Sequence, residues 1–395
     1  MYIAILGRQP AISIAELERV YDDVRWFSDT SALVKTDHID VQRLGGTQKA
    51  GRVISEINLG DWRRASMEIV QHYSKAWAGY EGKITLGISA YGFGGIDTRD
   101  IQKTGLILKN KLKGSPASLR LIPNQEAALS TATSHHNKLG LSDNKVELIV
   151  VRGTKGIIVA ESTGSQNITA LAARDQGRPK RDAFVGMLPP KLAQIMVNLS
   201  GLEKGLLLDP FCGTGVILQE ALLLGLDVYG SDLAQKMFEY TNANITWLIE
   251  SHHLQSTSYE VAVGDATTMT WQTFESPKGP QPLKIDAVVS ESYLGQPFSA
   301  PPSSAKLVEV RGNCNHIISE FLKNLGTQIK SGTPVVLAVP AWKDIGDQFT
   351  HLPLIALLDK LGYKTVEFAN IRPDQLLYFR PDQVVAREIL VLTKI

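Results

Sequence analysis

The residues with the clearest chemical potential lie in one stretch, 205–232, which reads GLLLDPFCGTGVILQEALLLGLDVYGSD. A loop containing Gly213 and Gly215 follows Asp209, and Asp232 comes 23 residues after Asp209. Because glycine has no Cβ, a ligand can approach the backbone of such a loop closely. An acid about 20 residues further on is where a unit of this kind binds a pair of ribose hydroxyls. The spacing therefore predicts a nucleoside site.

The loop carries neither of the common phosphate-binding patterns. It is not G-x-G-x-x-G, and the absence of G-x-x-x-x-G-K-[ST] excludes a P-loop. Asp209 and Pro210 open it instead, and a carboxylate at this point would repel a pyrophosphate. The same carboxylate suits the ammonium and sulfonium groups of S-adenosylmethionine. The alternative interpretation is a structural turn in another kind of α/β enzyme.

A second group of reactive residues follows two later strands. Asp265 ends one of them and can accept a hydrogen bond from an adenine amino group. The other, IDAVVS, delivers Glu291 and Tyr293, which suit methylation of an exocyclic amine. That nitrogen is a poor nucleophile, so the site must stack the base and accept hydrogen bonds from its N–H groups. A carboxylate matches the N1–H and N2–H donors of guanine, whereas the alternative for Glu291 is a solvent-exposed loop acid.

The elements that must position these residues alternate between strand and helix from Gly205 to the end of the chain. Such alternation predicts a mostly parallel sheet with ligands at the carboxyl ends of the strands. After the first βαβ unit we expect strands at 260–263, 285–289, 334–339, 365–369 and 388–392, and helices at 235–250, 305–325 and 354–361. A turn at 187–190 leads toward the same crevice.

The first 165 residues predict two small α+β regions, divided near residue 60. In the first, Ser13 to Glu16 has the pattern of a capping box, and nothing is catalytic in type, which favours a packing or spacer role. In the second, helices are expected at 64–77 and 99–112, with strands at 83–90, 117–122, 146–151 and 156–161.

Basic residues gather in two places. The segment 101–125 contains no acid and holds Lys103, Lys109, Lys111, Lys113 and Arg120. The segment 166–185 contains RDQGRPKRD, with Arg178 and Lys180. Such strips can neutralise backbone phosphates without reading sequence. The alternatives are a solvated helix face for the first and a charged linker for the second.

Composition narrows the class of protein. A chain of 395 residues with 44% hydrophobic and 21% charged residues predicts a globular protein of two or three domains. The net charge of +1 identifies no partner, so any nucleic-acid surface must be local. Two cysteines make no disulfide framework, so we expect a reducing cytoplasm. Neither His135-His136 nor His252-His253 has companions at metal spacing, so we expect no metal. We expect no signal peptide and no membrane span.

Taken together, these stretches resemble the THUMP-domain tRNA guanine-N2 methyltransferases that act on the position-10 guanosine. GRQPAISIAELE and LGGTQKAGRV look like the N-terminal ferredoxin-like domain of that family, and GLILKNKLKGSPASLRLI resembles its THUMP segment. RDQGRPKRDAFVGMLPPKLAQIMVNL is similar to the linker and following helix, DPFCGTGVILQEALLLG to the cofactor loop, and QVVAREILVLTK to the last strand.

The resemblance implies an α/β fold with a Rossmann-like, seven-stranded methyltransferase domain whose last strand is antiparallel. It implies a ferredoxin-like domain at 1–60, a THUMP RNA-binding domain at 61–165, a linker at 166–185 and the methyltransferase domain at 186–395. S-adenosylmethionine would contact Asp209, Pro210, Gly213 and Gly215 with its methionine part, Asp232 with its ribose and Asp265 with its adenine.

The implied activity is methyl transfer to the exocyclic N2 of a guanosine in tRNA, with Glu291 and Tyr293 as the catalytic residues. The THUMP domain would bind the tRNA acceptor end and select the guanosine by distance. The family's Asp-Pro-Pro-Tyr motif is Glu-Ser-Tyr-Leu here, at 291–294. An rRNA guanine or DNA amino-methyltransferase and a non-catalytic RNA-binding relative are therefore alternatives. The modified position, mono- or dimethylation, oligomeric state and need for a small activating subunit stay open.

Overall fold

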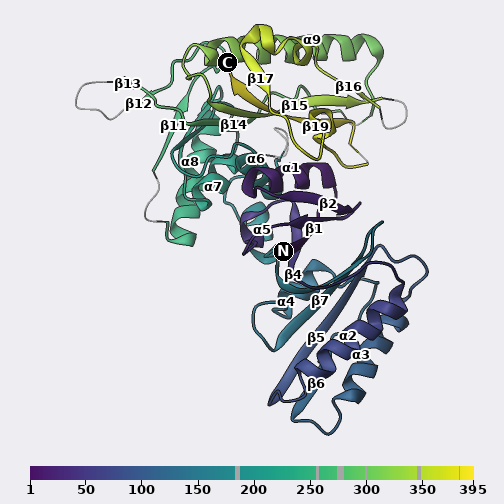
Figure 1. Cartoon of the computed structure of the whole chain (residues 1–395). Helices are drawn as coiled ribbons and strands as arrows, with labels where there is room; N and C mark the ends of the chain where they lie inside the picture. The colour runs from purple at the N-terminus through teal and green to yellow at the C-terminus, as the bar shows by residue number, and fades with distance from the viewer. Residues whose placement is uncertain (183–186, 255–257, 274–279, 299, 345–347, 382) are drawn as a thin grey trace. The chain divides into compact units, whose positions relative to one another are not determined.

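A computed structural model describes residues 1–182, 187–254, 258–273, 280–298, 300–344, 348–381 and 383–395. The chain divides into two compact units, Met1–Ala170 and Leu171–Ile395. Each unit is built on one large sheet (Figure 1). No helix in the described segments is both long and apolar enough to cross a membrane.

The described strands of unit 1 form an eight-stranded mixed sheet in the order β2-β3-β1-β4-β8-β7-β5-β6. Its strands are β1 Tyr2–Leu6, β2 Val24–Ser28, β3 Ser31–Val34, β4 Thr47–Ile57, β5 Gly82–Tyr91, β6 Ala117–Leu121, β7 Lys145–Arg152 and β8 Ile157–Ser165. Its helices are α1 Pro10–Val20, the 3₁₀ helix η1 Val41–Arg43, α2 Trp62–Ala76, α3 Thr98–Lys111 and α4 Thr131–His136. Helix α5, Ile168–Gln176, spans the boundary between the units.

The antiparallel pairing of β4 with β8 joins the two N-terminal regions into one sheet. A buried ion pair reinforces this junction, because Lys49 of β4 pairs with Glu147 of β7. Lys49 also donates to the carbonyl of Leu129 at 2.7 Å, and Ser89 of β5 donates to Glu147 at 2.6 Å. Burial lowers the pKa of Lys49, and the carboxylate of Glu147 opposes that shift. Lys49 is thus a buried structural residue of this junction.

The expected capping box at the start of the first helix is wrong. Helix α1 begins at Pro10, so Ser13 and Glu16 lie inside it. The carboxylate of Glu16 is fully buried and accepts hydrogen bonds from the backbone N–H groups of Gly45 and Gly46, at 2.8 and 2.7 Å. A proline at the first helical position needs no N–H partner, which explains why the helix begins at Pro10.

Unit 2 contains the expected seven-stranded path, in the order β11-β10-β9-β14-β15-β19-β17, with β16 and β18 attached to β15 and β19. Its strands are β9 Leu206–Asp209, β10 Asp227–Asp232, β11 Tyr259–Val263, β14 Ala287–Glu291, β15 Pro334–Lys343, β16 Phe349–Thr350, β17 Tyr363–Thr365, β18 Leu377–Tyr378 and β19 Val385–Lys394. Strands β12 Gln272–Thr273 and β13 Gln281–Pro282 form a separate pair. Strand β19 is antiparallel to both β15 and β17, as expected for the last strand.

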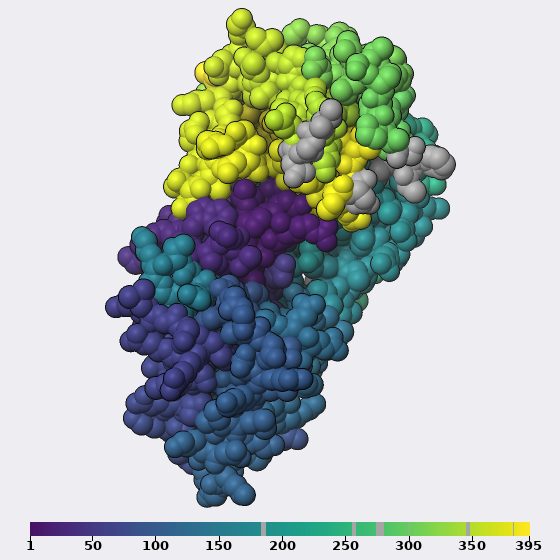
Figure 2. Space-filling model, turned by 90° about the vertical axis from the view of Figure 1, so that its right-hand side faces the viewer, coloured from purple at the N-terminus to yellow at the C-terminus, as the bar shows by residue number. Residues whose placement is uncertain are grey.

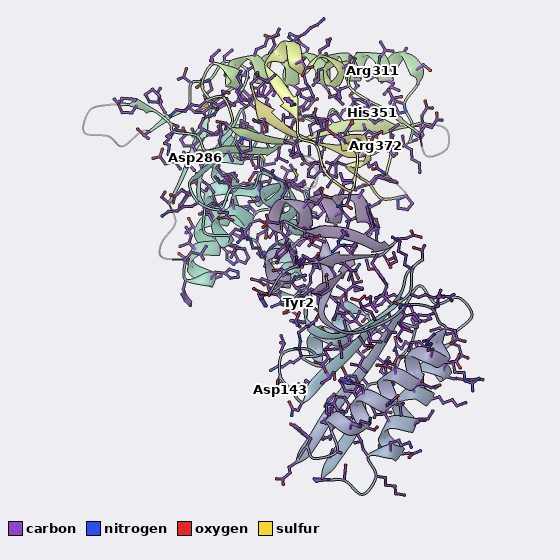
Figure 3. All side chains as sticks on the ribbon, viewed as in Figure 1. Tyr2, Asp143, Asp286, Arg311, His351 and Arg372 are labelled. Carbon is purple, nitrogen blue, oxygen red and sulfur yellow. The ribbon has the colours of Figure 1, made fainter. Side chains whose placement is uncertain are left out.

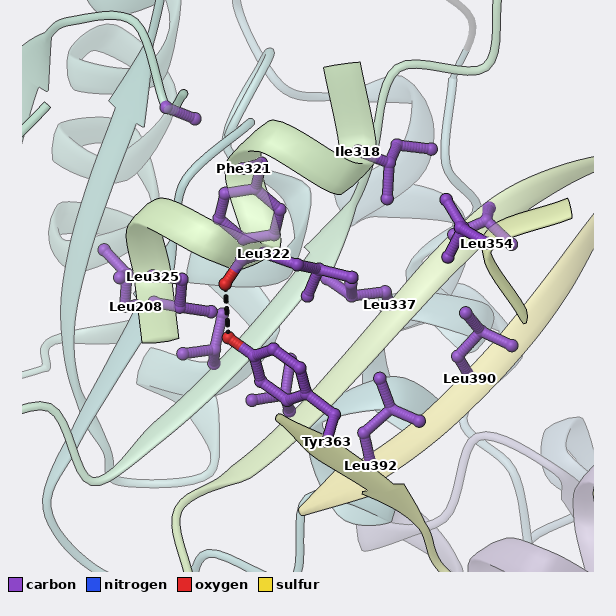
Figure 4. Packing of buried hydrophobic residues seen from close by; sticks show 14 of the residues in the cluster. Leu208, Ile318, Phe321, Leu322, Leu325, Leu337, Leu354, Tyr363, Leu390 and Leu392 are labelled. Atoms are coloured by element: carbon purple, nitrogen blue, oxygen red, sulfur yellow. Dashed lines mark hydrogen bonds between the residues drawn. The ribbon is translucent and has the colours of Figure 1, made fainter. Parts of the chain in front are cut away.

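Helices cover both faces of the sheet of unit 2 (Figure 1). They are α6 Pro190–Leu199, α7 Val216–Leu223, α8 Gln235–His252, α9 Ser304–Gly326 and the 3₁₀ helices η2 Pro353–Leu357, η3 Asp359–Leu361 and η4 Pro373–Gln375. Helix α9 lies on the face opposite α6, α7 and α8. Under α9, Phe321 and Leu322 pack into a core with Leu337 and Leu392, and Tyr363 donates to the carbonyl of Leu322 at 2.8 Å (Figure 4).

Two expectations near the C-terminus are wrong. The helix expected at 354–361 is a pair of short 3₁₀ helices, and the strand expected at 365–369 lies at Tyr363–Thr365. Gly362, whose φ is +84°, ends the second of these 3₁₀ helices and leads directly into β17.

Candidate active site

A pocket of about 700 Å³ opens where β9, β10 and β14 end. Its volume is typical of a small-molecule site. Of the residues expected to bind cofactor or substrate, the following line it: Asp209, Pro210, Gly213, Asp232, Asp265, Glu291 and Tyr293. The carboxyl ends of parallel strands therefore bring together residues that are up to 84 positions apart in the sequence.

Gly215 is absent from the lining residues, and its role is in packing. Its φ is +79°, and a Cβ at this position would lie 2.9 Å from Cγ2 of Thr241 in α8. The same threonine donates through Oγ1 to the carbonyl of Gly213 at 2.8 Å. Gly213 lines the pocket and also has a left-handed φ, of +51°. The loop needs both glycines for its backbone shape, and Gly215 also for its contact with α8.

Asp209 is the most buried acid of the pocket, with 1% of its surface exposed. Ser290 of β14 donates to its Oδ1 at 2.6 Å, and the backbone N–H of Phe211 donates to the same oxygen at 3.3 Å. Desolvation nevertheless raises the pKa of Asp209 to about 8, and the negative charges of Asp232 and Glu291 add to this shift. The group is therefore mostly protonated at neutral pH and would ionise when a cation binds.

The carboxylates of Asp232 and Asp265 already accept some hydrogen bonds from nearby backbone N–H groups. Asp232 accepts from the N–H of Gly213 through Oδ2 and from that of Ala234 through Oδ1, both at 3.0 Å. Burial raises the pKa of Asp232. Asp265 accepts through Oδ1 from the N–H and hydroxyl of Thr267, at 2.9 and 2.7 Å, and its Oδ2 has no partner within the described segments. Both carboxyl groups are held in place and retain acceptor capacity.

Glu291 is the last residue of β14, and its carboxylate is bound by an arginine from another strand. Nε of Arg387, in β19, donates to Oε1 of Glu291. The two side chains are 9% and 16% exposed. Oε2 of Glu291 accepts no hydrogen bond from the described part of the chain. The alternative of a solvent-exposed loop acid is therefore wrong, because Glu291 ends a strand and faces a pocket.

The loop after Glu291 is anchored without the two prolines that the family motif has. The hydroxyl and the backbone N–H of Ser292 both donate to the carbonyl of Ala338, at 2.9 and 3.0 Å. Gly295 takes a left-handed φ of +82°, which ends the loop against α9. Tyr293 lies between these two fixed points and keeps 40% of its surface exposed. An aromatic side chain is thus available at the pocket.

The residues of the basic strip in unit 1 lie on α3, on β6 and between them, and the following are exposed: Lys103, Lys109, Lys111, Lys113 and Arg120. The region coloured blue in Figure 2, which includes this part of the chain, lies on the molecular surface. In unit 2, Lys180 is also exposed. These positions are accessible to a polyanion.

The structure contradicts the prediction that Arg178 contacts RNA. No surface of its side chain is exposed, and its nearest acid, Asp175, lies 4.0 Å away. Close to it, Arg174 makes a two-pronged pair with Glu220 of α7, at 2.7 and 3.1 Å. The segment with RDQGRPKRD is therefore packed against α7 through Arg174, and only part of its charge is available to a partner.

Several residues of the site were not predicted from the sequence. Ser290 and Arg387 contact expected residues that lie 81 and 96 positions away, so no local pattern signalled them. His316 and Glu320 of α9 also line the pocket and were not predicted. Leu188 lines it too, as the turn at 187–190 suggested. In the described segments, no three His, Cys, Asp or Glu side chains are grouped so that they could hold a metal ion.

Parts of this chain are similar in sequence to known proteins. The family described as RMKL-like, methyltransferase domain, matches residues 178–269. The tRNA (guanine(10)-N2)-dimethyltransferase of Methanothermobacter thermautotrophicus is 33% identical over 174 residues, which are 43% of this chain and 44% of that protein. The probable tRNA (guanine(10)-N2)-dimethyltransferase of Methanothermococcus thermolithotrophicus is 34% identical over 149 residues, 38% of this chain and 78% of that protein. The chain thus spans less than half the length of the first relative.

A solved structure extends the comparison to the whole fold. The crystal structure of TrmN from Thermus thermophilus aligns over 100% of this chain and 99% of its own, with a TM-score of 0.51 and 16% identity. Such a likeness concerns the fold alone. Both units therefore belong to one known architecture, an α/β methyltransferase fold preceded by a mixed sheet.

Proposed function

The chain belongs to the tRNA (guanine(10)-N2)-dimethyltransferase family, and we propose that it transfers methyl groups from S-adenosylmethionine to the exocyclic N2 of a guanosine in tRNA. One observation carries the proposal: the cofactor loop at Asp209 and the pair Glu291 and Tyr293 line the same pocket. A site for a cationic nucleoside thus adjoins groups that can hold a base.

The acids of the pocket fit this cofactor. Oδ2 of Asp209 has no hydrogen-bond partner in the described segments, and the buried carboxyl ionises most readily beside a cation such as an ammonium or sulfonium group. Asp232 retains lone pairs for ribose hydroxyls, and Oδ2 of Asp265 can accept from an adenine amino group. When bound, S-adenosylmethionine supplies the electrophilic methyl carbon. Asp209, Asp232 and Asp265 bind and orient it.

Glu291 and Tyr293 handle the target base in this proposal. The guanosine leaves its stack and enters the pocket, where Tyr293 stacks on its face. Oε2 of Glu291 accepts hydrogen bonds from the N–H donors of guanine and takes up the proton that N2 loses. The hydrogen bonds of Ser292 to Ala338 fix the loop that carries Tyr293, which supports catalysis over a binding-only role.

Unit 1 supplies the RNA-binding surface in this proposal. We infer a ferredoxin-like region at 1–60, a THUMP region at 61–165, a linker at 166–185 and a methyltransferase domain at 186–395. The first two share one sheet through β4 and β8. The exposed lysines of 103–113 and Arg120 would contact tRNA phosphates in the cytoplasm.

Methyl transfer by the purified full-length protein tests the proposal. With methyl-labelled S-adenosylmethionine, we expect label in tRNA as N2-methylated guanosine, and little in rRNA fragments or duplex DNA. Glu291→Gln should retain cofactor binding and reduce transfer to a low residual rate that single-turnover assays can measure. Label in rRNA or DNA but not in tRNA would refute the substrate assignment. Cofactor binding without transfer to any nucleic acid would favour the non-catalytic alternative.

A further inference from the structure

We propose that Arg387 is a positioning residue for this reaction, which holds the carboxylate of Glu291 so that Oε2 faces the target base. The inference rests on the proposed function and goes beyond it, because it assigns a role to a residue outside the pocket lining. Nε of Arg387 occupies Oε1, so only the other carboxylate oxygen is left without a protein donor in the described segments.

The sheet register explains why an arginine makes this contact. Glu291 of β14 lies beside Ala338 of β15, and Arg387 of β19 lies beside Pro340 of β15. Glu291 and Arg387 are therefore separated by one whole strand, which is about 10 Å at two strand spacings of about 4.8 Å. A long side chain is needed to cross β15, and the planar guanidinium then presents Nε to the carboxylate in a fixed direction.

The burial and charge of the pair favour a functional role over a surface contact. The two side chains are only 9% and 16% exposed, so little water competes for the ion pair. Glu291 also lies near the acid Asp209, and Asp232 lines the same pocket. No lysine or arginine is among the described residues that line the pocket. Arg387, directly behind Glu291, is therefore placed to offset this negative charge.

The length of the Glu291 side chain explains why its carboxylate needs to be held by Arg387. The resembling family has an aspartate at this position, and glutamate adds one methylene and one rotatable bond. An unanchored glutamate would lose more rotamer freedom when it binds the base. Arg387 removes that freedom beforehand, so the carboxylate is already in place when the guanine arrives. The arginine should consequently act only through Glu291.

Kinetics of an Arg387→Gln variant test this role. We expect kcat for tRNA methylation to fall by about 100-fold, since a misplacement of about 1 Å has this effect. The dissociation constant for S-adenosylmethionine should change by less than about twofold, because Arg387 does not line its pocket. Arg387→Lys should recover part of kcat. Arg372→Gln, at an exposed arginine paired with Asp374 (Figure 3), is the matched control and should behave as the wild type.

A double-mutant cycle with Glu291→Gln separates positioning from a general structural effect. In single-turnover assays, Arg387→Gln should cause no further loss once Glu291 is an amide. An additional loss in that background, an equal loss of cofactor affinity, or full activity of Arg387→Gln would overturn the inference. If Arg387→Gln fails to fold by circular dichroism, Arg387→Lys decides: wild-type kcat overturns the inference, and reduced kcat with unchanged cofactor affinity supports it. Inactivity of the wild type on every RNA refutes the proposed function itself, and this inference with it.

Discussion

Replacing Asp209 with asparagine tests whether this buried carboxyl must ionise to bind the cofactor. Burial raises its pKa to about 8, although Ser290 and Phe211 both donate hydrogen bonds to Oδ1. Asparagine has nearly the same shape and keeps an oxygen acceptor for both donors. The substitution therefore removes the titrating proton while it preserves the local packing.

The expected size of the pH effect follows from the raised pKa. With a pKa of about 8, the carboxylate fraction is about 1% at pH 6 and about 25% at pH 7.5. Because a cationic cofactor binds the ionised form, binding releases a proton and affinity increases as pH rises toward 8. The dissociation constant should consequently fall by about 20-fold between pH 6 and pH 7.5. The window ends there because the cofactor's own α-amino group, with a pKa of about 7.7, is about half deprotonated just above it.

Isothermal titration calorimetry at pH 6, 7 and 7.5 measures this dependence directly. Repeating each titration in two buffers with different ionisation enthalpies gives the number of protons released. Asp209→Asn should bind S-adenosylmethionine weakly and with little pH dependence. Asp143→Asn, at an exposed acid of unit 1 (Figure 3), is the control and should reproduce the wild-type slope. A flat wild-type profile, or the same slope in Asp209→Asn, would refute the reasoning.

Three further predictions concern the base, the RNA and the loop. Tyr293→Ala should raise KM for tRNA and leave cofactor affinity unchanged, because stacking is worth about 1–3 kcal/mol per base, whereas Tyr293→Phe should keep both values. Replacing the four lysines of 103–113 with glutamine should weaken tRNA binding. The slope of the logarithm of the binding constant against the logarithm of the salt concentration should become shallower by up to about 0.9 for each phosphate that the variant no longer neutralises. An unchanged slope would contradict their role. Gly215→Ala should destabilise unit 2 by about 1–3 kcal/mol in denaturant unfolding, because of its left-handed φ and its closeness to Thr241, and a wild-type midpoint would argue against both.

The sequence predicted those parts of the site that follow from strand ends. Asp209, Asp232 and Glu291 each end a strand, Asp265 lies two residues beyond the end of β11, and parallel strands bring such positions to one edge. Their clustering in one pocket therefore needed only the order of strands and helices. The seven-stranded path followed from the family resemblance, and the structure confirms it.

The remaining features depend on contacts between distant elements. Arg387 reaches Glu291 across β15, which requires the register of three strands. Ser13 and Glu16 matched a local capping pattern, but tertiary burial committed Glu16 to the turn at 45–46. A charge pattern suggested that Arg178 was accessible, and packing buried it. In each case a long-range interaction decided the role of the residue, and local spacing carries no information about such interactions.

Nucleoside mass spectrometry of tRNA from cells that lack this protein tests the central claim most directly. The account predicts that N2-methylated guanosine at the position-10 site disappears from their tRNA. It should return when the wild-type gene is restored, but not with the Glu291→Gln variant. Unchanged N2-methylguanosine and N2,N2-dimethylguanosine in the tRNA of cells without the protein would contradict the account.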